Sequence, residues 1–219
     1  MRLIVMTATI GRPEHPLYLG GPTKHPVDFV RFTKDILPDW PPERATRYPK
    51  IMPHKWLVPT DYSIWLDSNI SLVQDPWKLI EYLGDNDIAF FPHHWGHDCI
   101  YQEVENIITF HKDDPQRVRE QAEEYRKEGY PAHNGLIWGK VIVRRHTKKI
   151  EYLNKGWWQE IKNGSHRDQL SFNYVSWKLG IPYSTITAKE SDVFFWWLGK
   201  HEGYKERMKK PVIEFMKEV

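Results

Sequence analysis

The sequence has a single cysteine, Cys99, among its 219 residues, so no disulfide can form within the chain. Nothing in it therefore requires an oxidising compartment. Long apolar runs are also missing: no stretch approaches the roughly 20 residues of a membrane-spanning helix. The apolar start from Met1 to Thr7 is too short for a secretory signal and is followed by no small-residue cleavage site. We therefore expect a cytoplasmic protein without a membrane span, or a fragment of a larger one.

Neither sign of charge dominates the chain. Lysine and arginine number 31 and aspartate and glutamate 29, for a net charge of +2, which does not by itself indicate a nucleic-acid partner. Two basic runs, 144–149 and 205–210, are expected to be solvated surface, with a patch for an anionic acceptor as the alternative. The chain has no internal repeat, coiled coil or low-complexity tract, so we expect one domain over residues 1–219.

Aromatic residues are abundant, with 11 Trp, 11 Tyr and 9 Phe. Most of them are expected in the core, and a few of these flat rings could line a cleft that binds a sugar or a base.

Apolar runs and helix-period patterns alternate along the chain, which predicts an α/β fold with a mostly parallel, Rossmann-like central sheet flanked by helices. Gly180 is predicted to end one helix, and Asp75 with Pro76 to begin another. The tail beyond Ser191 reads as a Trp/Phe cluster followed by a basic helix. Predicted strands are 3–8, 27–32, 62–66, 87–91, 136–143 and 183–187, and predicted helices are 76–83, 99–110, 113–127, 148–162 and 170–179, with a short helix possible within the Pro-rich stretch at 43–48.

The acid-polar-amide turn Asp67-Ser68-Asn69 follows the apolar strand 62–66 directly. Carboxylates at the C-terminal end of a strand face the crevice in which α/β sheets bind ligands. Oxygen ligands of this kind suit a hard divalent cation that also takes substrate phosphates. Arg47 and Lys50 lie shortly upstream and could contact the same phosphates. The group predicts a site for a metal and a diphosphate, and a plain polar turn is the alternative.

These residues form a longer pattern. Arg47, Lys50, Pro53 and His54, followed by the run from Asp61 to Asn69, resemble the R-x-x-K-[IL]-x-P-H and D-Y-S-I-W-[IL]-D-G-[NS] signature of the TOD/MUCI-type glycosyltransferase-like family. Thr7 to Gly11 resembles its opening T-A-I-F-G, Phe32-Thr33 its F-T-D, and Arg167 to Phe172 its R-D-Q-L-S-F. The sequence departs from the family pattern at Ser68, Lys34 and Asn69.

The resemblance implies a GT-A fold that uses a nucleotide-sugar donor, with a UDP-sugar favoured, and Mn²⁺ or Mg²⁺. It places Thr7, Ala8 and Asp28 near the nucleotide base and Arg47 and Lys50 on the diphosphate. It makes Asp67 the principal metal ligand, assisted by Asn69 and by the late histidine His201. The alternatives are an ordinary surface acid for Asp28, surface charge in a Pro-rich loop for Arg47 and Lys50, and an incidental residue for His201.

The segment Arg167-Asp168-Gln169 resembles the one that retaining GT-A enzymes place beside the donor sugar, which implies catalytic roles for Asp168 and Gln169. Asp168 also suits a helix N-cap, and the two roles can coexist. For the acceptor, the candidates are His93, His94, His133 and Asn134. Zinc binding by the histidine cluster is the less favoured alternative, because the cluster lacks the spacing of structural zinc sites.

The predicted function is a glycosyltransferase, hexosyl or pentosyl and with retention favoured, which acts on a glycan, a glycoprotein or a modified nucleobase. Two alternatives stay open. One is a metal-dependent phosphohydrolase, which would need more carboxylates near Asp67 than the sequence shows. The other is a non-catalytic carbohydrate- or nucleic-acid-binding domain on a GT-A scaffold.

Overall fold

A computed structural model describes residues 1–11, 14–93, 96–187 and 195–197. A central sheet of six strands is ordered β2-β1-β3-β6-β5-β7. Five strands run parallel, and β6 is antiparallel to both of its neighbours, β3 and β5. The predicted mostly parallel α/β sheet is thus confirmed. The strands are β1 (Leu3–Ala8), β2 (Val27–Phe32), β3 (Tyr62–Leu66), β5 (Ile88–Pro92), β6 (Ile137–Arg145) and β7 (Ser184–Thr185).

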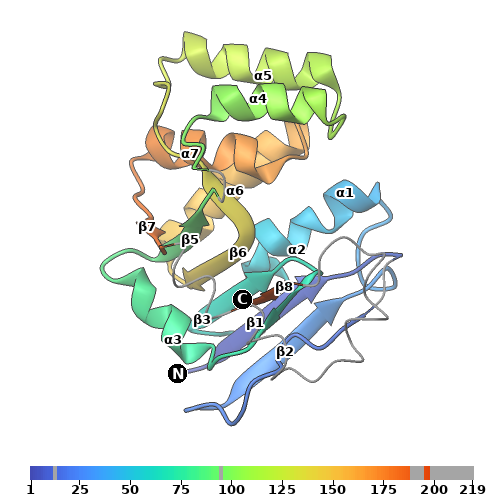
Figure 1. Ribbon diagram of the computed structural model, residues 1–219, viewed down its shortest axis with the longest axis vertical. Coiled ribbons are helices and arrows are strands. Elements are labelled where there is room, and N and C mark those ends of the chain that lie inside the picture. Colours follow the sequence, from blue (N-terminus) through green and yellow to red (C-terminus); the bar gives the residue numbers. More distant parts are fainter. Residues whose placement is uncertain (12–13, 94–95, 188–194, 198–219) are drawn as a thin grey trace.

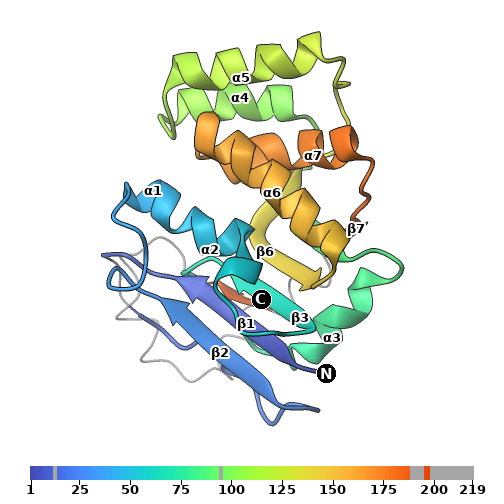
Figure 2. The ribbon, with the colours of Figure 1, turned by 180° about the vertical axis from the view of Figure 1, so that it is seen from behind.

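Helices cover both faces of this sheet (Figures 1 and 2). One hydrophobic core lies between the sheet and the long helices. A second lies on the opposite face, under the helix α3 (Trp77–Ile80) and the short strand β4 (Ile70–Leu72). The six residues of β1 are all buried, as expected for a strand that is covered on both faces. The helices are α1 (Pro42–Ala45), α2 (Arg47–Ile51), α3 (Trp77–Ile80), α4 (Ile100–Thr109), α5 (Pro115–Lys127), α6 (Lys148–Asn163) and α7 (Asp168–Leu179), with 3₁₀ turns at Pro53–Lys55 and Glu81–Leu83.

Local chemistry explains where several helices begin and end. Asp114 caps α5 by accepting a hydrogen bond from the Arg117 backbone N–H at 2.7 Å, and Thr147 caps α6 in the same way. Gly180 ends α7 with a left-handed φ of 63°, so the predicted C-cap is confirmed. The helices α4 and α5 form a hairpin that lies over α7 at the top of Figure 1.

The short helix considered possible at 43–48 is present as α1 and α2, and α2 carries Arg47 and Lys50. One feature was not expected from the sequence. A second sheet has two strands, β4 (Ile70–Leu72) and β8 (Phe195–Trp197). The strand β4 directly follows the acidic turn. The basic helix expected in the tail, with the run 205–210, lies outside the described residues. Within the described residues, no helix has both the length and the apolar character needed to cross a bilayer.

Candidate functional site

A cavity of about 430 Å³ opens where β1 and β3 end. Ala8, the last residue of β1, and Asp67, which follows β3, both line it. Because β6 runs antiparallel to β3, the beginning of β6 reaches the same edge, and Gly139 and Lys140 also line the cavity. The first residues of α7, Asp168 and Gln169, and the helix α2 complete the wall. The cavity therefore lies at the strand ends where the sequence predicted it.

Arg47 and Lys50 are three positions apart on α2, so both project from one side of this helix. The ammonium group of Lys50 lies 3.2 Å from Oδ1 of Asp67 and also forms an ion pair with Oδ2 of Asp168. Arg47 Nε lies 3.8 Å from Oδ1 of Asp168. Residues that are far apart in the sequence are thus joined through one buried lysine.

The charges of this group are enclosed. The side chains of Lys50 and Asp168 are 1% and 3% exposed, against 27% for Asp67. Burial alone raises the pKa of the Asp168 carboxyl, but Lys50, Arg47 and Arg167 outweigh it and hold that pKa well below its usual range. Asp168 is therefore ionised at neutral pH.

Asp67 is held in place by its neighbours. Its Oδ1 accepts a hydrogen bond from Trp65 Nε1 at 2.9 Å, which is possible because Trp65 and Asp67 face the same side of the strand. Its backbone N–H donates to the carbonyl of Lys140 at 2.8 Å, and its carbonyl closes the turn to Ile70. Asn69 lines the same cavity. Both of the predicted metal ligands that the structure describes thus line the cavity, and their metal-binding role stays a prediction.

Asp168 is not a helix cap. It is the first residue of α7, whose N-cap is Arg167, and no side chain caps this end. The capping interpretation was wrong, because the carboxylate turns toward Lys50. The backbone of Asp168 is anchored instead, since Trp157 Nε1 donates to its carbonyl at 3.0 Å. Gln169 Nε2 donates to the carbonyl of Ile137 at 2.9 Å.

The remaining predicted donor-site residues lie outside this group. Thr7 is fully buried and does not line the cavity. Asp28 pairs with Ile4 in the sheet, near the start of β1, and forms an exposed ion pair with Arg2 at 2.8 Å. Because the cavity is at the other end of these parallel strands, the structure does not bring Asp28 to it.

The predicted acceptor residues lie around the loop before β6 and the start of α4. His93 is buried, and its ring stacks on that of His97 with 5.3 Å between ring centroids. His133 is exposed, has a positive φ of 55°, and lies with Nδ1 2.7 Å from Asp98 Oδ1. Asn134 is exposed in the same loop. His93, His133 and Asn134 do not line the cavity, and His94 and His201 lie outside the described residues.

Arg144 was expected on a solvated surface, and this was wrong. It is fully buried on β6, its guanidinium lies 5.9 Å from the ring of Trp157, and it has no hydrogen-bond partner among the described residues. Burial lowers its pKa to about 9. The strand expected at 136–143 extends through this residue to Arg145, which explains why a basic run became partly interior.

Among the cavity residues that were not predicted as site residues, Arg167, Lys140 and Gly139 lie closest to the two acids in sequence or in contact. Arg167 is largely enclosed, and desolvation lowers its pKa. Burial likewise lowers the pKa of Lys140 to about 8, opposed by the nearby Asp67. Gly139 lets α7 approach β6, because a Cβ there would lie 3.1 Å from Asp168 Oδ2. Arg167 could have been found from its place beside Asp168, whereas a lysine and a glycine within a strand carry no such signal.

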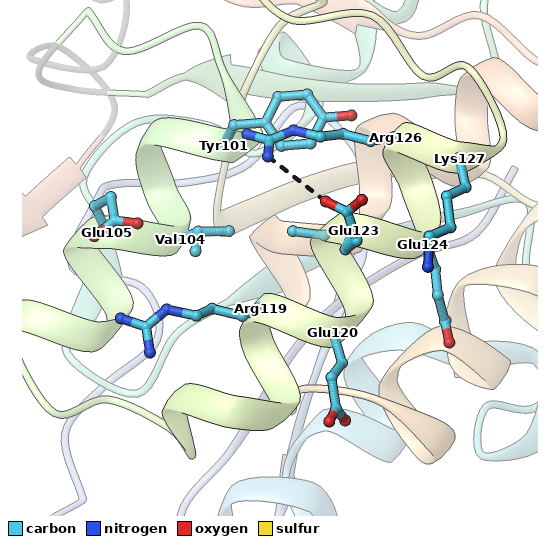
Figure 3. A pocket seen from close by; sticks show the side chains of 10 residues that line it. Tyr101, Val104, Glu105, Arg119, Glu120, Glu123, Glu124, Arg126 and Lys127 are labelled. Atoms are coloured by element: carbon cyan, nitrogen blue, oxygen red, sulfur yellow. Dashed lines mark ion pairs between the residues drawn. The ribbon is translucent and has the colours of Figure 1, made fainter.

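A second hollow of about 560 Å³ lies on the α4–α5 hairpin (Figure 3). Charged side chains of both signs line it, and its one drawn ion pair joins Arg126 to Glu123 at 3.7 Å. Both partners are more than half exposed, so this hollow has the character of ordinary charged surface. In the described part of the chain, no group of three or more His, Cys, Asp or Glu side chains is placed to hold a metal ion.

Comparison with known proteins identifies the family. A model of the TOD1/MUCI70 glycosyltransferase-like domain matches residues 36–194. The chain belongs to this family. It is 27% identical over 146 residues to the probable hexosyltransferase MUCI70 of Arabidopsis thaliana, which covers 62% of this chain and 25% of that protein. The chain thus spans about a quarter of the length of this curated relative.

Solved structures of glycosyltransferases are also similar to the chain. A glycosyltransferase involved in glycosylation of the major capsid of PBCV-1 matches over 100% of both chains, with 11% identity and a TM-score of 0.47. Mouse xyloside xylosyltransferase 1 matches over 84% of both chains, with 9% identity and a TM-score of 0.44. At TM-scores this low, the likeness carries no conclusion of its own.

Proposed function

We propose that the chain is a GT-A-type glycosyltransferase that moves a sugar, hexosyl or pentosyl, from a nucleoside diphosphate sugar, with a UDP-sugar favoured, to a hydroxyl group of a glycan, a glycoprotein or another acceptor. The observation that carries this proposal is the linked group of Asp67, Lys50 and Asp168 in a cavity at the strand ends. Buried charges with a shifted pKa in a cleft are typical of functional sites. The family membership agrees with this chemistry.

The residues present fit a divalent cation that the donor helps to bind. Asp67 Oδ1 is occupied by Lys50 and Trp65, which leaves Oδ2 and the Asn69 amide oxygen as ligands. Mg²⁺ and Mn²⁺ are commonly held by one or two protein oxygens, with phosphates and water filling the other positions. When bound there, such an ion would offset the negative charge of the diphosphate.

The chain's own residues supply the rest of the electrostatics. As the bond to the sugar breaks, negative charge builds on the departing diphosphate, and fixed cations stabilise it. Arg47 lines the cavity with 19% of its side chain exposed, so it can contact the phosphates directly. Lys50 is enclosed between two acids. We assign it the role of holding Asp67 and Asp168 in place while adding positive charge to the wall of the cavity.

Asp168 is better suited to binding the donor sugar than to accepting the proton of the acceptor hydroxyl. A carboxylate whose pKa lies far below neutral is a weak general base, since efficient bases titrate near the working pH. We therefore assign Asp168 to accept hydrogen bonds from donor-sugar hydroxyls and to stabilise positive charge at the anomeric carbon, with Gln169 beside it. The acceptor proton would then pass to the departing phosphate, which favours retention of configuration.

The test is release of nucleotide from a panel of UDP- and GDP-sugars by the purified protein with Mn²⁺ or Mg²⁺. We expect turnover of at least one UDP-sugar, and a fall of roughly 10²-fold or more in Asp168→Asn with UDP affinity nearly unchanged. Asp35→Asn is the matched control, because Asp35 is exposed and does not line the cavity. Equal turnover in the two variants would remove Asp168 from the mechanism, and no nucleotide release from any sugar would refute the function.

A further inference from the structure

We propose that Lys140 binds the diphosphate of the donor, as a contact from the sheet that complements those from α2. This inference rests on the proposed function and goes beyond it by assigning a residue that the family signature in this sequence does not contain. Four observations support it: the position of Lys140 on β6, its link to Asp67, the charge balance of the cavity, and the close approach of α7.

Lys140 lies beside the acidic turn. Leu66, the last residue of β3, pairs with Val141, so Lys140 is opposite Asp67, and its carbonyl accepts the Asp67 backbone N–H at 2.8 Å. This hydrogen bond fixes the two residues relative to each other whatever their side chains do. The side chain of Lys140 is half-buried, lines the cavity, and holds its ammonium group 5.5 Å from the centre of the Trp138 ring.

The charge balance of the cavity favours an anion. Its lining carries five lysine and arginine residues and three carboxylates. Two of those carboxylates, Asp67 and Asp168, already share Lys50. Cations that converge on a partly desolvated cavity in excess of its acids are stabilised by a bound dianion, and phosphate oxygens accept such charge-assisted hydrogen bonds well. The basic residues are Arg47, Lys50, Lys112, Lys140 and Arg167, and the acids are Glu43, Asp67 and Asp168.

The two acids, Asp67 and Asp168, both lie against one short segment of β6, Gly139-Lys140. A Cβ at Gly139 would lie 3.1 Å from Asp168 Oδ2, so β6 passes directly against that carboxylate. The next residue along the strand is bonded to Asp67. The segment Gly139-Lys140 therefore contacts both acids proposed to flank the donor. Because Lys140 lines the same cavity as these acids, its ammonium group is within reach of a diphosphate bound there.

The test measures binding of UDP and of neutral uridine by calorimetry, with Mg²⁺ present, to the full chain and three variants. Lys140→Met keeps most of the apolar stem and removes the charge, whereas Lys140→Arg keeps the charge. We expect Lys140→Met to bind UDP roughly tenfold to a hundredfold more weakly, because a hydrogen bond to a charged group is lost. Uridine binding should not change, and Lys140→Arg should stay close to the unaltered protein. Lys148→Met is the matched control, since the Lys148 side chain is 92% exposed and remote from the cavity lining.

The outcomes separate the two proposals. If the unaltered protein binds UDP and a folded Lys140→Met binds it equally well, the assignment of Lys140 is overturned while the proposed function stands. Equal weakening of UDP and uridine would also overturn it, because the effect would then come from packing on Trp138 and not from charge. If the unaltered protein does not bind UDP, the proposed UDP-sugar donor is itself wrong and the assignment falls with it.

Discussion

The cavity at the strand ends and the hollow on the α4–α5 hairpin contain similar kinds of residue in opposite environments. In the hairpin hollow, the ion pair between Arg126 and Glu123 has side chains that are 59% and 53% exposed (Figure 3). In the cavity, Lys50 and Asp168 pair with 1% and 3% exposed. The two have comparable volumes, about 560 Å³ for the hairpin hollow and about 430 Å³ for the cavity. Volume therefore does not separate a site from a surface here, and the burial of paired charges does.

The largest effect of a substitution is expected at Lys50, the buried lysine of the cavity. Lys50→Met leaves Asp67 and Asp168 close together without their shared cation, and breaking a buried ion pair in this way costs about 3–5 kcal/mol. We expect a fall of that size in the free energy of unfolding, measured by urea denaturation. The double variant Lys50→Met/Asp168→Asn should lose less than the sum of the two single variants, because it removes one of the unpaired acids. Strict additivity would mean that the pair does not hold the site together.

Asp113 connects the two regions, because it precedes α5 and binds the segment that leads into α7. Its carboxylate accepts hydrogen bonds from Ser165 Oγ at 2.6 Å and from the His166 backbone N–H at 2.9 Å. Asp113→Asn should lower the free energy of unfolding at pH 7 by about 1.5–3 kcal/mol, the usual loss for hydrogen bonds to a charged group. Asp35→Asn, which is exposed, should lose almost nothing.

The same residue gives the expected pH dependence. Burial raises the pKa of Asp113, but its hydrogen bonds with Ser165, Asp114 and His166 outweigh this and leave the pKa lowered. A lowered pKa stabilises the fold above the unfolded value of about 4. This stabilisation is lost as the pH falls from about 4 through the lower pKa that Asp113 has in the folded protein. Urea midpoints below pH 4 should therefore fall less steeply in Asp113→Asn than in the unaltered protein, and equal slopes would contradict the assignment.

Gly139 tests how tightly the cavity is packed. Gly139→Ala places a methyl group 3.1 Å from Asp168 Oδ2 and 3.4 Å from Gln169 Cγ, so the side chains of these first residues of α7 have to give way. Overpacking of this kind costs about 1–3 kcal/mol, and we expect sugar transfer to fall by more than the lost stability alone would cause. Gly21→Ala is the control, because a Cβ there meets nothing within 4 Å. Unchanged transfer by Gly139→Ala would show that α7 tolerates displacement.

The smallest effect is expected on the hairpin. Glu123→Gln removes an exposed partner of Arg126, and such surface pairs contribute at most about 1 kcal/mol. Both the melting temperature and nucleotide release should stay close to those of the unaltered protein. A large loss of activity with intact stability would contradict the comparison and make the hairpin part of the site.

Much of the site was predictable because its residues carry local signals. Asp67 follows a strongly apolar strand with Arg47 and Lys50 shortly upstream, and these residue types in that order indicated a metal and a diphosphate. For Asp168, the resemblance to the family implied a place beside the donor sugar. Asp28 was misleading because only the resemblance placed it near the base. It lies near the start of strand 27–32, whereas ligands of α/β sheets bind at the C-terminal ends of the strands. Arg144 was misleading because a charged run usually marks a surface, whereas here a strand continues through it into the core.

By itself, the sequence determined the alternation of strands and helices and the acid turn after β3, because hydrophobic periodicity and turn chemistry act over a few neighbouring residues. Only the tertiary structure decided that Lys50 joins Asp67 to Asp168, that Asp168 is not a helix cap, and that Lys140 faces the same cavity. Those outcomes depend on the antiparallel direction of β6 and on how closely α7 approaches it. Such contacts join residues more than a hundred positions apart, as between Lys50 and Asp168, and no local pattern encodes them.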